Sequence, residues 1–213
     1  MNKKFFYLGY FLSPFIAIIF YYFSTGAVLD SYSVSIMLGV YACVLVGNQL
    51  YLASQPAWVI ALLGATSTRS LHSTSPLLLL LFIIIHAIMK LSNGFSITTI
   101  QVILGLIAFI LMLVGTIFAL LLFTNTLLTK QEKFSQFRTR MYAKTHLTYQ
   151  KVRAIHNLMV VAGVLVLIHA ILASSSILSY NPWGVSILAI WMLFTLLTYL
   201  NYRLHGRKKR GKL

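Results

Sequence analysis

The fold is decided by the stretch Arg153-Ala-Ile-His156-Asn-Leu-Met-Val-Val-Ala-Gly-Val-Leu-Val-Leu-Ile-His169, and its plan recurs between Arg69 and His86. Each stretch places one histidine at the start of an apolar run and a second histidine 13 or 14 residues later. A histidine inside an apolar segment is unfavourable, and such residues usually have a functional partner. Four of them in two matched pairs predict a shared ligand.

The composition predicts a membrane protein. Of 213 residues, 59% are hydrophobic and 9% are charged, and the only acidic residues are Asp30 and Glu132. In soluble domains, roughly a quarter of all residues are charged. Six apolar runs reach the length of about 20 residues that crosses a bilayer. We therefore predict one all-α domain over residues 1–213, a six-transmembrane-helix bundle with spans at about 5–23, 32–53, 72–89, 98–124, 153–174 and 182–202.

Three prolines predict irregularities in the first and third spans and in the link between the second and third. Pro14 predicts a kink in the first span, which packed neighbours tolerate in membranes. Residues 57–64, behind Pro56, are apolar but too short to cross, so they predict an interfacial helix. Ser75 and Pro76 have the character of an N-cap and a first-turn proline. They predict that the regular helix of the third span begins there.

Further signals come from small and capping residues. Gly39 and Gly47 predict close helix approach in the second span. The pattern that begins at Thr98 fits a capping box for the fourth span. Asn181 followed by Pro182 predicts the N-cap and first turn of the sixth span.

The distribution of charge predicts the orientation. All of the 17 Lys and Arg residues except Lys90 lie in the N-terminus, the link 54–71, the loop 125–152 or the C-terminal tail, with Arg153 and Arg203 counted among these segments. The positive-inside rule then places both termini in the cytoplasm. It also explains the net charge of +15 without a nucleic-acid partner. We expect a multi-pass protein of the cell membrane, with the lipid bilayer as its first partner.

The third and fifth spans run in the same direction, so their histidines lie at matching depths. A rise of 1.5 Å per residue separates the histidines by about 21 Å in one span and about 20 Å in the other. We call His72 and His156 the inner pair, and His86 and His169 the outer pair. This arrangement predicts two haem b groups stacked across the bilayer, one held by each pair.

Rotation about the helix axis fits less well in the fifth span. At about 100° per residue, His86 lies within about 40° of His72, whereas His169 lies about 140° from His156 on an ideal helix. A kink, a π-bulge or ligation around the edge of the helix would have to close this gap.

Ligation by two histidines leaves iron no open position, so such haems carry single electrons. Arg69 and Arg153 stand three residues before the inner histidines. They are candidates for pairing with inner haem propionates, and ordinary cytoplasmic flanking charges are the alternative. His146 is a reserve ligand, and His205 is expected at the surface.

Other interpretations remain open at this stage. Each histidine could instead bond a neighbouring carbonyl or serine in the bundle. The spans contain no carboxylates, which argues against a metal-ion transporter and against acid–base hydrolysis. A haem-free transporter, or a scaffold whose basic tail binds anionic lipid, is the alternative from another class.

The four histidines and the two strings around them resemble the ferric reductase-like transmembrane domain family, which includes ferric reductases and the membrane half of NADPH oxidases. The matching positions are His72, His86, His156 and His169, with Arg69-Ser-Leu-His72 and Arg153-Ala-Ile-His156-Asn-Leu as local strings. The likeness extends over residues 5–204. It implies two haems, and electron transfer from a cytoplasmic-side donor to an extracellular-side acceptor such as ferric iron, a flavoprotein or oxygen.

Two features depart from the family pattern. Pro76 falls where family members continue a helix. The sequence also ends after the sixth span and has no Gly-rich dinucleotide fingerprint, so no FAD or NAD(P)H site is expected in this chain. The expected class is an oxidoreductase subunit whose donor is a separate flavoprotein or a membrane quinol. The small quinol-linked relatives that serve an extracytoplasmic reductase are the nearest alternative.

Overall fold

The computed structural model describes residues 2–120, 132–145 and 148–206, and the regular structure in these ranges is helical throughout. Its helices are α1 (Lys3–Ser24), α2 (Ser31–Ala53), α3 (Ala57–Leu63), α4 (Ala65–Ser92), α5 (Ile100–Phe118), α6 (Glu132–Thr145), α7 (Tyr149–Asn157), α8 (Met159–Leu172) and α9 (Pro182–Asn201). Within the described ranges, six segments are long and apolar enough to cross a membrane: α1, α2, α4, α5, α7 with α8, and α9. The predicted all-helical class is confirmed, and the six segments indicate a multi-pass membrane protein.

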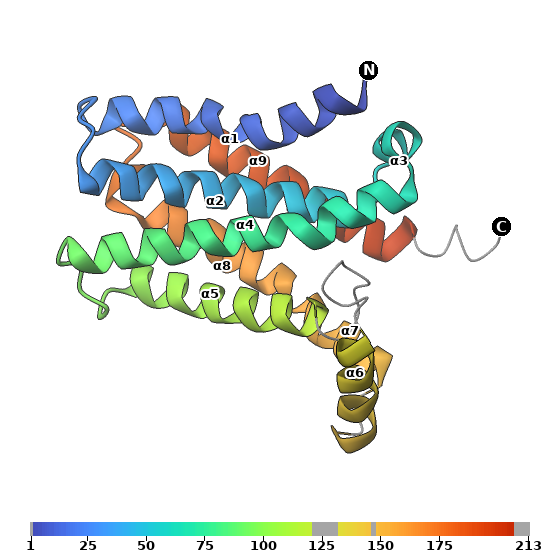
Figure 1. Cartoon of the computed structure of the whole chain (residues 1–213). Coiled ribbons are helices and arrows are strands. Elements are labelled where there is room, and N and C mark those ends of the chain that lie inside the picture. Colours follow the sequence, from blue (N-terminus) through green and yellow to red (C-terminus); the bar gives the residue numbers. More distant parts are fainter. Residues whose placement is uncertain (1, 121–131, 146–147, 207–213) are drawn as a thin grey trace.

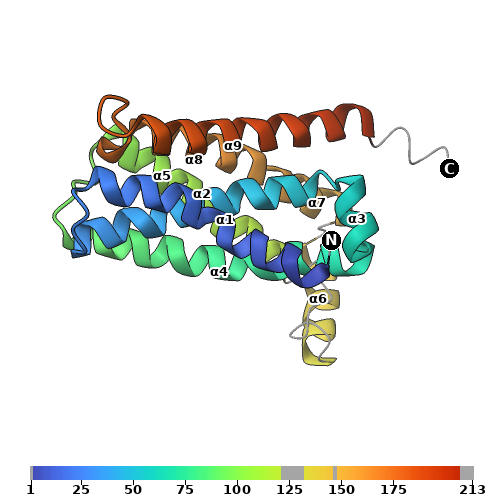
Figure 2. The same ribbon diagram turned by 90° about the horizontal axis from the view of Figure 1, so that it is seen from above.

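The six long segments run up and down along one axis (Figure 1). Helix α2 lies at the centre, where it packs against α1, α4, α8 and α9, and 14 of its 23 residues are buried. The antiparallel pairs α2 with α4 and α5 with α8 make the most extensive contacts. Helix α9 lies along one side of the bundle, next to α8 (Figure 2).

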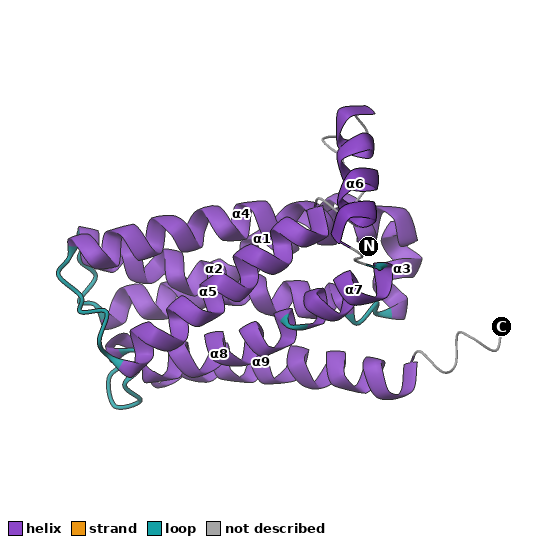
Figure 3. Ribbon diagram, turned by 90° about the horizontal axis from the view of Figure 1, so that it is seen from below, coloured by secondary structure: helices purple, strands orange, loops and turns teal. Residues whose placement is uncertain are grey.

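The two ends of the bundle differ in charge. One end carries the N-terminus, α3, α6, α7 and the end of α9, together with every described Lys and Arg except Lys90. We call it the basic end. The far end carries the loops that join α1 to α2, α4 to α5 and α8 to α9 (Figure 3). Its only charged residues among those described are Asp30 and Lys90.

Helix α1 continues through Pro14, and the bundle compensates for the hydrogen bond that this proline removes. Proline has no N–H, so the carbonyl of Tyr10, four residues earlier, loses its helical donor. The side-chain amide of Asn48 donates to that carbonyl at 3.0 Å, and the hydroxyl of Ser13 donates to it at 3.2 Å. The oxygen of Asn48 accepts from the indole N–H of Trp191 at 3.0 Å. Asn48 thus connects α1, α2 and α9 through polar contacts inside the bundle.

Two predicted helix starts are wrong. Helix α4 begins at Ala65 and continues through Pro76, because the hydroxyl of Ser75 donates to the Leu71 carbonyl at 2.7 Å instead of capping a new helix. No capping box opens α5, because its N-cap is Thr99, which makes no side-chain cap hydrogen bond. The hydroxyl of Thr98 contacts that of Ser96 instead, at 2.6 Å.

Other local predictions are confirmed. A short helix, α3, follows Pro56. Asn181 caps α9 by accepting from the backbone N–H of Gly184 at 3.0 Å, with Pro182 in the first turn. Gly47 approaches the indole of Trp191, from which an added Cβ would lie 2.8 Å away. The predicted end of the fourth span, near residue 124, lies outside the described residues.

The fifth span is interrupted at Leu158, which separates α7 from α8. The backbone N–H of Leu158 bonds the Ile155 carbonyl three residues earlier, at 3.0 Å, so the turn is tighter than an α-helical turn. This interruption lies between His156 and His169. An irregularity here is one of the three ways that the sequence offered to close the rotational gap between these histidines.

Replacing Asn48 with Leu should lower the free energy of unfolding by about 1–3 kcal/mol, because interhelical hydrogen bonds in membranes contribute about 0.6 to 1.7 kcal/mol each. The substitution also leaves the Tyr10 carbonyl with only Ser13 as donor. The measurement is denaturation in mixed micelles, with Ser13→Ala as the milder control. Unchanged stability of Asn48→Leu would contradict this account of α1.

Candidate functional site

The structure brings the four predicted histidines together in the two predicted pairs. In the outer pair, the ring centres of His86 and His169 lie 6.4 Å apart, with the ring planes at 85°. In the inner pair, those of His72 and His156 lie 6.2 Å apart, with the planes at 83°. Helix α4 supplies one member of each pair, and α7 and α8 supply the others.

These distances fit ligation of one metal ion by two imidazoles. A metal–nitrogen bond to imidazole is about 2.0–2.1 Å long, so two rings on opposite faces of one ion have centres about 6.3 Å apart. Both pairs have this spacing, and it is the same at both depths. Crossed ring planes are compatible with it, because each ring can turn about its own metal–nitrogen bond.

In the outer pair, backbone carbonyls hold one nitrogen of each ring. Nδ1 of His86 lies 2.6 Å from the Ser35 carbonyl oxygen of α2, and Nδ1 of His169 lies 2.6 Å from the Gln101 carbonyl oxygen of α5. A carbonyl oxygen only accepts, so each Nδ1 carries the proton and donates. Each Nε2 is then the unprotonated nitrogen. This is the arrangement that second-sphere carbonyls impose on histidines that bind metals.

Glycines make these contacts sterically feasible. An added Cβ on Gly39 would lie 2.7 Å from Cε1 of His86, and one on Gly105 would lie 2.7 Å from Nδ1 of His169. Each glycine stands four residues after the carbonyl that its histidine bonds, so the ring enters the space that a side chain would fill. The sequence predicted close helix packing at Gly39 but not its contact with the His86 ring. It gave no prediction for Gly105.

The inner pair is held differently. The ring of His156 interacts with the backbone carbonyl of Gly115 on α5. Nδ1 of His72 is buried and has no hydrogen-bond partner among the described residues, and the same holds for Oε1 of Gln49 on α2. Gln49 is 14 residues from Ser35, as His72 is from His86, and α2 and α4 are antiparallel. This register places Gln49 at the depth of His72.

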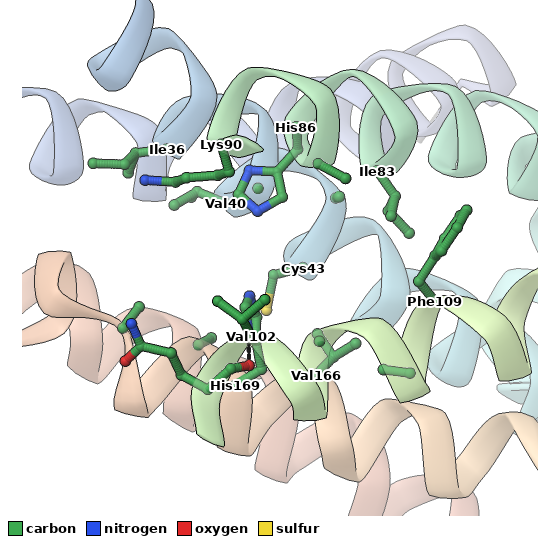
Figure 4. Close-up of a pocket in the computed structure, with 18 of the residues that line it drawn as sticks. Ile36, Val40, Cys43, Ile83, His86, Lys90, Val102, Phe109, Val166 and His169 are labelled. Carbon is green, nitrogen blue, oxygen red and sulfur yellow. Dashed lines mark hydrogen bonds between the residues drawn. The ribbon is translucent and has the colours of Figure 1, made fainter. Parts of the chain in front are cut away.

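A cavity separates the two members of the outer pair. His86 and His169 enter it from opposite sides (Figure 4). The cavity has a volume of about 230 Å³. Apolar side chains of α2, α4, α5 and α8 form most of its wall, including those of Val40, Ile83, Phe109 and Val166. We call this space the outer cavity.

The donor set favours a metal that brings further ligands of its own. Among residues 2–120, 132–145 and 148–206, no three His, Cys, Asp or Glu side chains converge on one point. Protein sites for zinc and similar ions need three or four such ligands. Two histidines per site fit a porphyrin, whose four nitrogens complete the coordination of iron. Two histidines at each site are thus compatible with haem.

The remaining predicted residues lie at the basic end. Arg69 on α4 and Arg153 on α7 are exposed, one turn before the inner histidines. His205 is exposed near the end of α9, and its Nδ1 lies 2.9 Å from Oδ1 of Asn201. The reserve ligand, His146, lies outside the described residues, as do residues 125–131 of the basic loop and the tail from 207 onward.

Comparisons with protein-family models, with curated proteins and with solved structures found no match to this chain.

In haem-free protein, His86 and His169 should both carry their proton on Nδ1, because each Nδ1 donates to a carbonyl. Nitrogen NMR of protein with isotope-labelled histidine measures this, and His86→Ala and His169→Ala assign the two signals. Protonation of Nε2 in either residue would show that the ring is reversed and would leave no lone pair toward the outer cavity.

Proposed function

We propose that this chain is a transmembrane haem b electron-transfer protein of the ferric reductase-like kind, with one haem at each histidine pair. The observation that carries the proposal is the repeated spacing of 6.2 Å and 6.4 Å between paired rings at two depths. When bound, each haem supplies reversible one-electron chemistry. The two histidines of each pair would hold the iron, and the surrounding side chains would supply an apolar environment.

Carbonyl bonding alone does not account for the histidines. The bonds to Ser35 and Gln101 satisfy Nδ1 of the outer rings and leave each Nε2 to find a partner. Both outer rings line the outer cavity. Haem ligation at Nε2 would give both rings a second partner together, and this is why we prefer it to a haem-free bundle.

The orientation of the chain follows from its charge, and the inside-to-outside direction of transfer is the one that the resemblance implies. We place the basic end in the cytoplasm by the positive-inside rule, with the inner pair nearer that side and the outer pair nearer the acceptor. Arg69 and Arg153, exposed one turn before the inner histidines, would then pair with carboxylates of the inner haem. The donor is a separate flavoprotein or a membrane quinol, and the acceptor is outside the cell. Reduction by a quinol analogue without added protein distinguishes the two donors.

Protein purified from haem-replete cells should show a low-spin b-type spectrum on reduction, with about two haems per chain. His86→Ala and His169→Ala should each lower the content to about one, because each pair needs both of its ligands. The measurement is a reduced-minus-oxidised spectrum with pyridine haemochrome quantification. His205→Ala is the matched control, since His205 is exposed at the basic end.

Colourless wild-type protein would overturn the proposal and favour the transporter or scaffold alternative. If the wild-type protein is coloured but His86→Ala retains both haems, the predicted pairing of the histidines is wrong.

Gly39→Ala and Gly105→Ala should remove the outer haem and spare the inner one, although neither residue is a ligand. In each variant the new methyl group would occupy space within 3 Å of an outer imidazole, so the ring must leave its carbonyl. Gly9→Ala is the control, because an added Cβ there meets nothing within 4 Å. Full haem content in both site variants would show that ring position is not set by these glycines.

A further inference from the structure

Lys90 is the single basic residue at the far end of the described chain, and it lines the outer cavity. It stands four residues after His86, one turn further along α4, so the two side chains share a face of that helix. Figure 4 shows both on the same side of the cavity, across from His169. Every other described Lys and Arg lies at the basic end. The position of Lys90 is therefore exceptional for this protein and needs an explanation of its own.

Two aromatic rings hold the ammonium group at the mouth of the cavity. Nζ of Lys90 lies 4.0 Å from the ring centre of Tyr32 and 4.3 Å from that of Phe95. Those two rings are stacked, with centres 5.8 Å apart and planes at 7°. Cation–π contacts of this kind stabilise and orient an ammonium group, but they do not neutralise its charge.

Among the described residues, no carboxylate forms an ion pair with Lys90. The only acidic residue at this end is Asp30, which is exposed and caps α2 by accepting from the backbone N–H of Ser33 at 2.7 Å. That hydrogen bond lowers the pKa of the Asp30 carboxyl, so the carboxyl is ionised. Its charge is used to cap the N-terminus of α2. A partly buried cation at an apolar cavity favours an anionic partner. The partner must come with the ligand.

We propose that Lys90 binds a carboxylate of the molecule that occupies the outer cavity, which under the proposed function is a propionate of the outer haem. This inference rests on that function and adds a cationic anchor, Lys90, to the two histidines that would hold the haem. Iron porphyrin carries its carboxylates on one edge, so Lys90 would also fix which edge faces the far end. Charge-assisted hydrogen bonds between ammonium and carboxylate are stronger than neutral ones, and this gives the contact its selectivity.

The test compares haem with haem dimethyl ester, in which both carboxylates are masked. Haem-free full-length protein carrying His72→Ala is titrated with each porphyrin, so that only the outer pair binds. Lys90→Met and Lys90→Arg are made in the same background, and Arg203→Met at the basic end is the control. The same titrations on protein with the inner pair intact guard against misfolding of the background. There, the outer site is the binding phase that His86→Ala removes.

With Lys90 present, the outer site should bind haem at least about tenfold more tightly than the ester, the scale of one charge-assisted hydrogen bond. Lys90→Met should remove this preference by weakening haem alone, whereas Lys90→Arg and Arg203→Met should retain it. Equal weakening of both porphyrins by Lys90→Met would overturn the inference and leave Lys90 a structural role. Protein that binds neither porphyrin at either pair would overturn the proposed function itself, and this inference with it.

Discussion

An imidazole inside an apolar helix bundle needs a polar partner for each of its two nitrogens. In the outer pair the first partner is a backbone carbonyl that is already part of a helix. The carbonyls of Ser35 and Gln101 lie within regular helix or its first turn, and a carbonyl oxygen has a second lone pair that can accept from a ring N–H. No extra polar side chain is therefore required in the membrane. The second nitrogen, Nε2, makes no bond to these carbonyls and is available for a ligand in the outer cavity.

The same device occurs in two antiparallel helix pairs. In α2 and α4, the Ser35 carbonyl and Gly39 face His86, and in α5 and α8, the Gln101 carbonyl and Gly105 face His169. In both cases the glycine follows the carbonyl by four residues. A glycine at that position leaves the carbonyl exposed on the side where the ring arrives. The outer pair is thus built from two equivalent half-sites, one from each helix pair.

Much of this arrangement could be predicted from the sequence, because helices convert residue spacing into depth. The spacings of 14 and 13 residues predicted that the histidines lie at two common levels, and the rotational mismatch in the fifth span left an irregularity, such as the one at Leu158, as one of three ways to close the gap. The glycine and carbonyl partners could not be predicted. Which carbonyl faces which ring depends on the register between helices distant in sequence, and no local pattern encodes that register. The capping signals at Ser75 and Thr98 failed for a different, local reason, since the hydroxyl of Ser75 bonds the Leu71 carbonyl and that of Thr98 contacts Ser96.

The scarcity of carboxylates shapes what such a bundle can do. Asp30 precedes α2 and Glu132 lies in α6, so the six membrane-length segments contain no acidic side chain. The outer histidines, His86 and His169, would use one nitrogen for a carbonyl and the other for iron, which leaves neither nitrogen free to carry protons. Under the proposed function, electrons would therefore cross between the two levels without a proton following along acidic side chains. The movement would transfer net charge across the bilayer, and the membrane potential would act directly on its driving force, by about 2.3 kcal/mol per charge for each 100 mV.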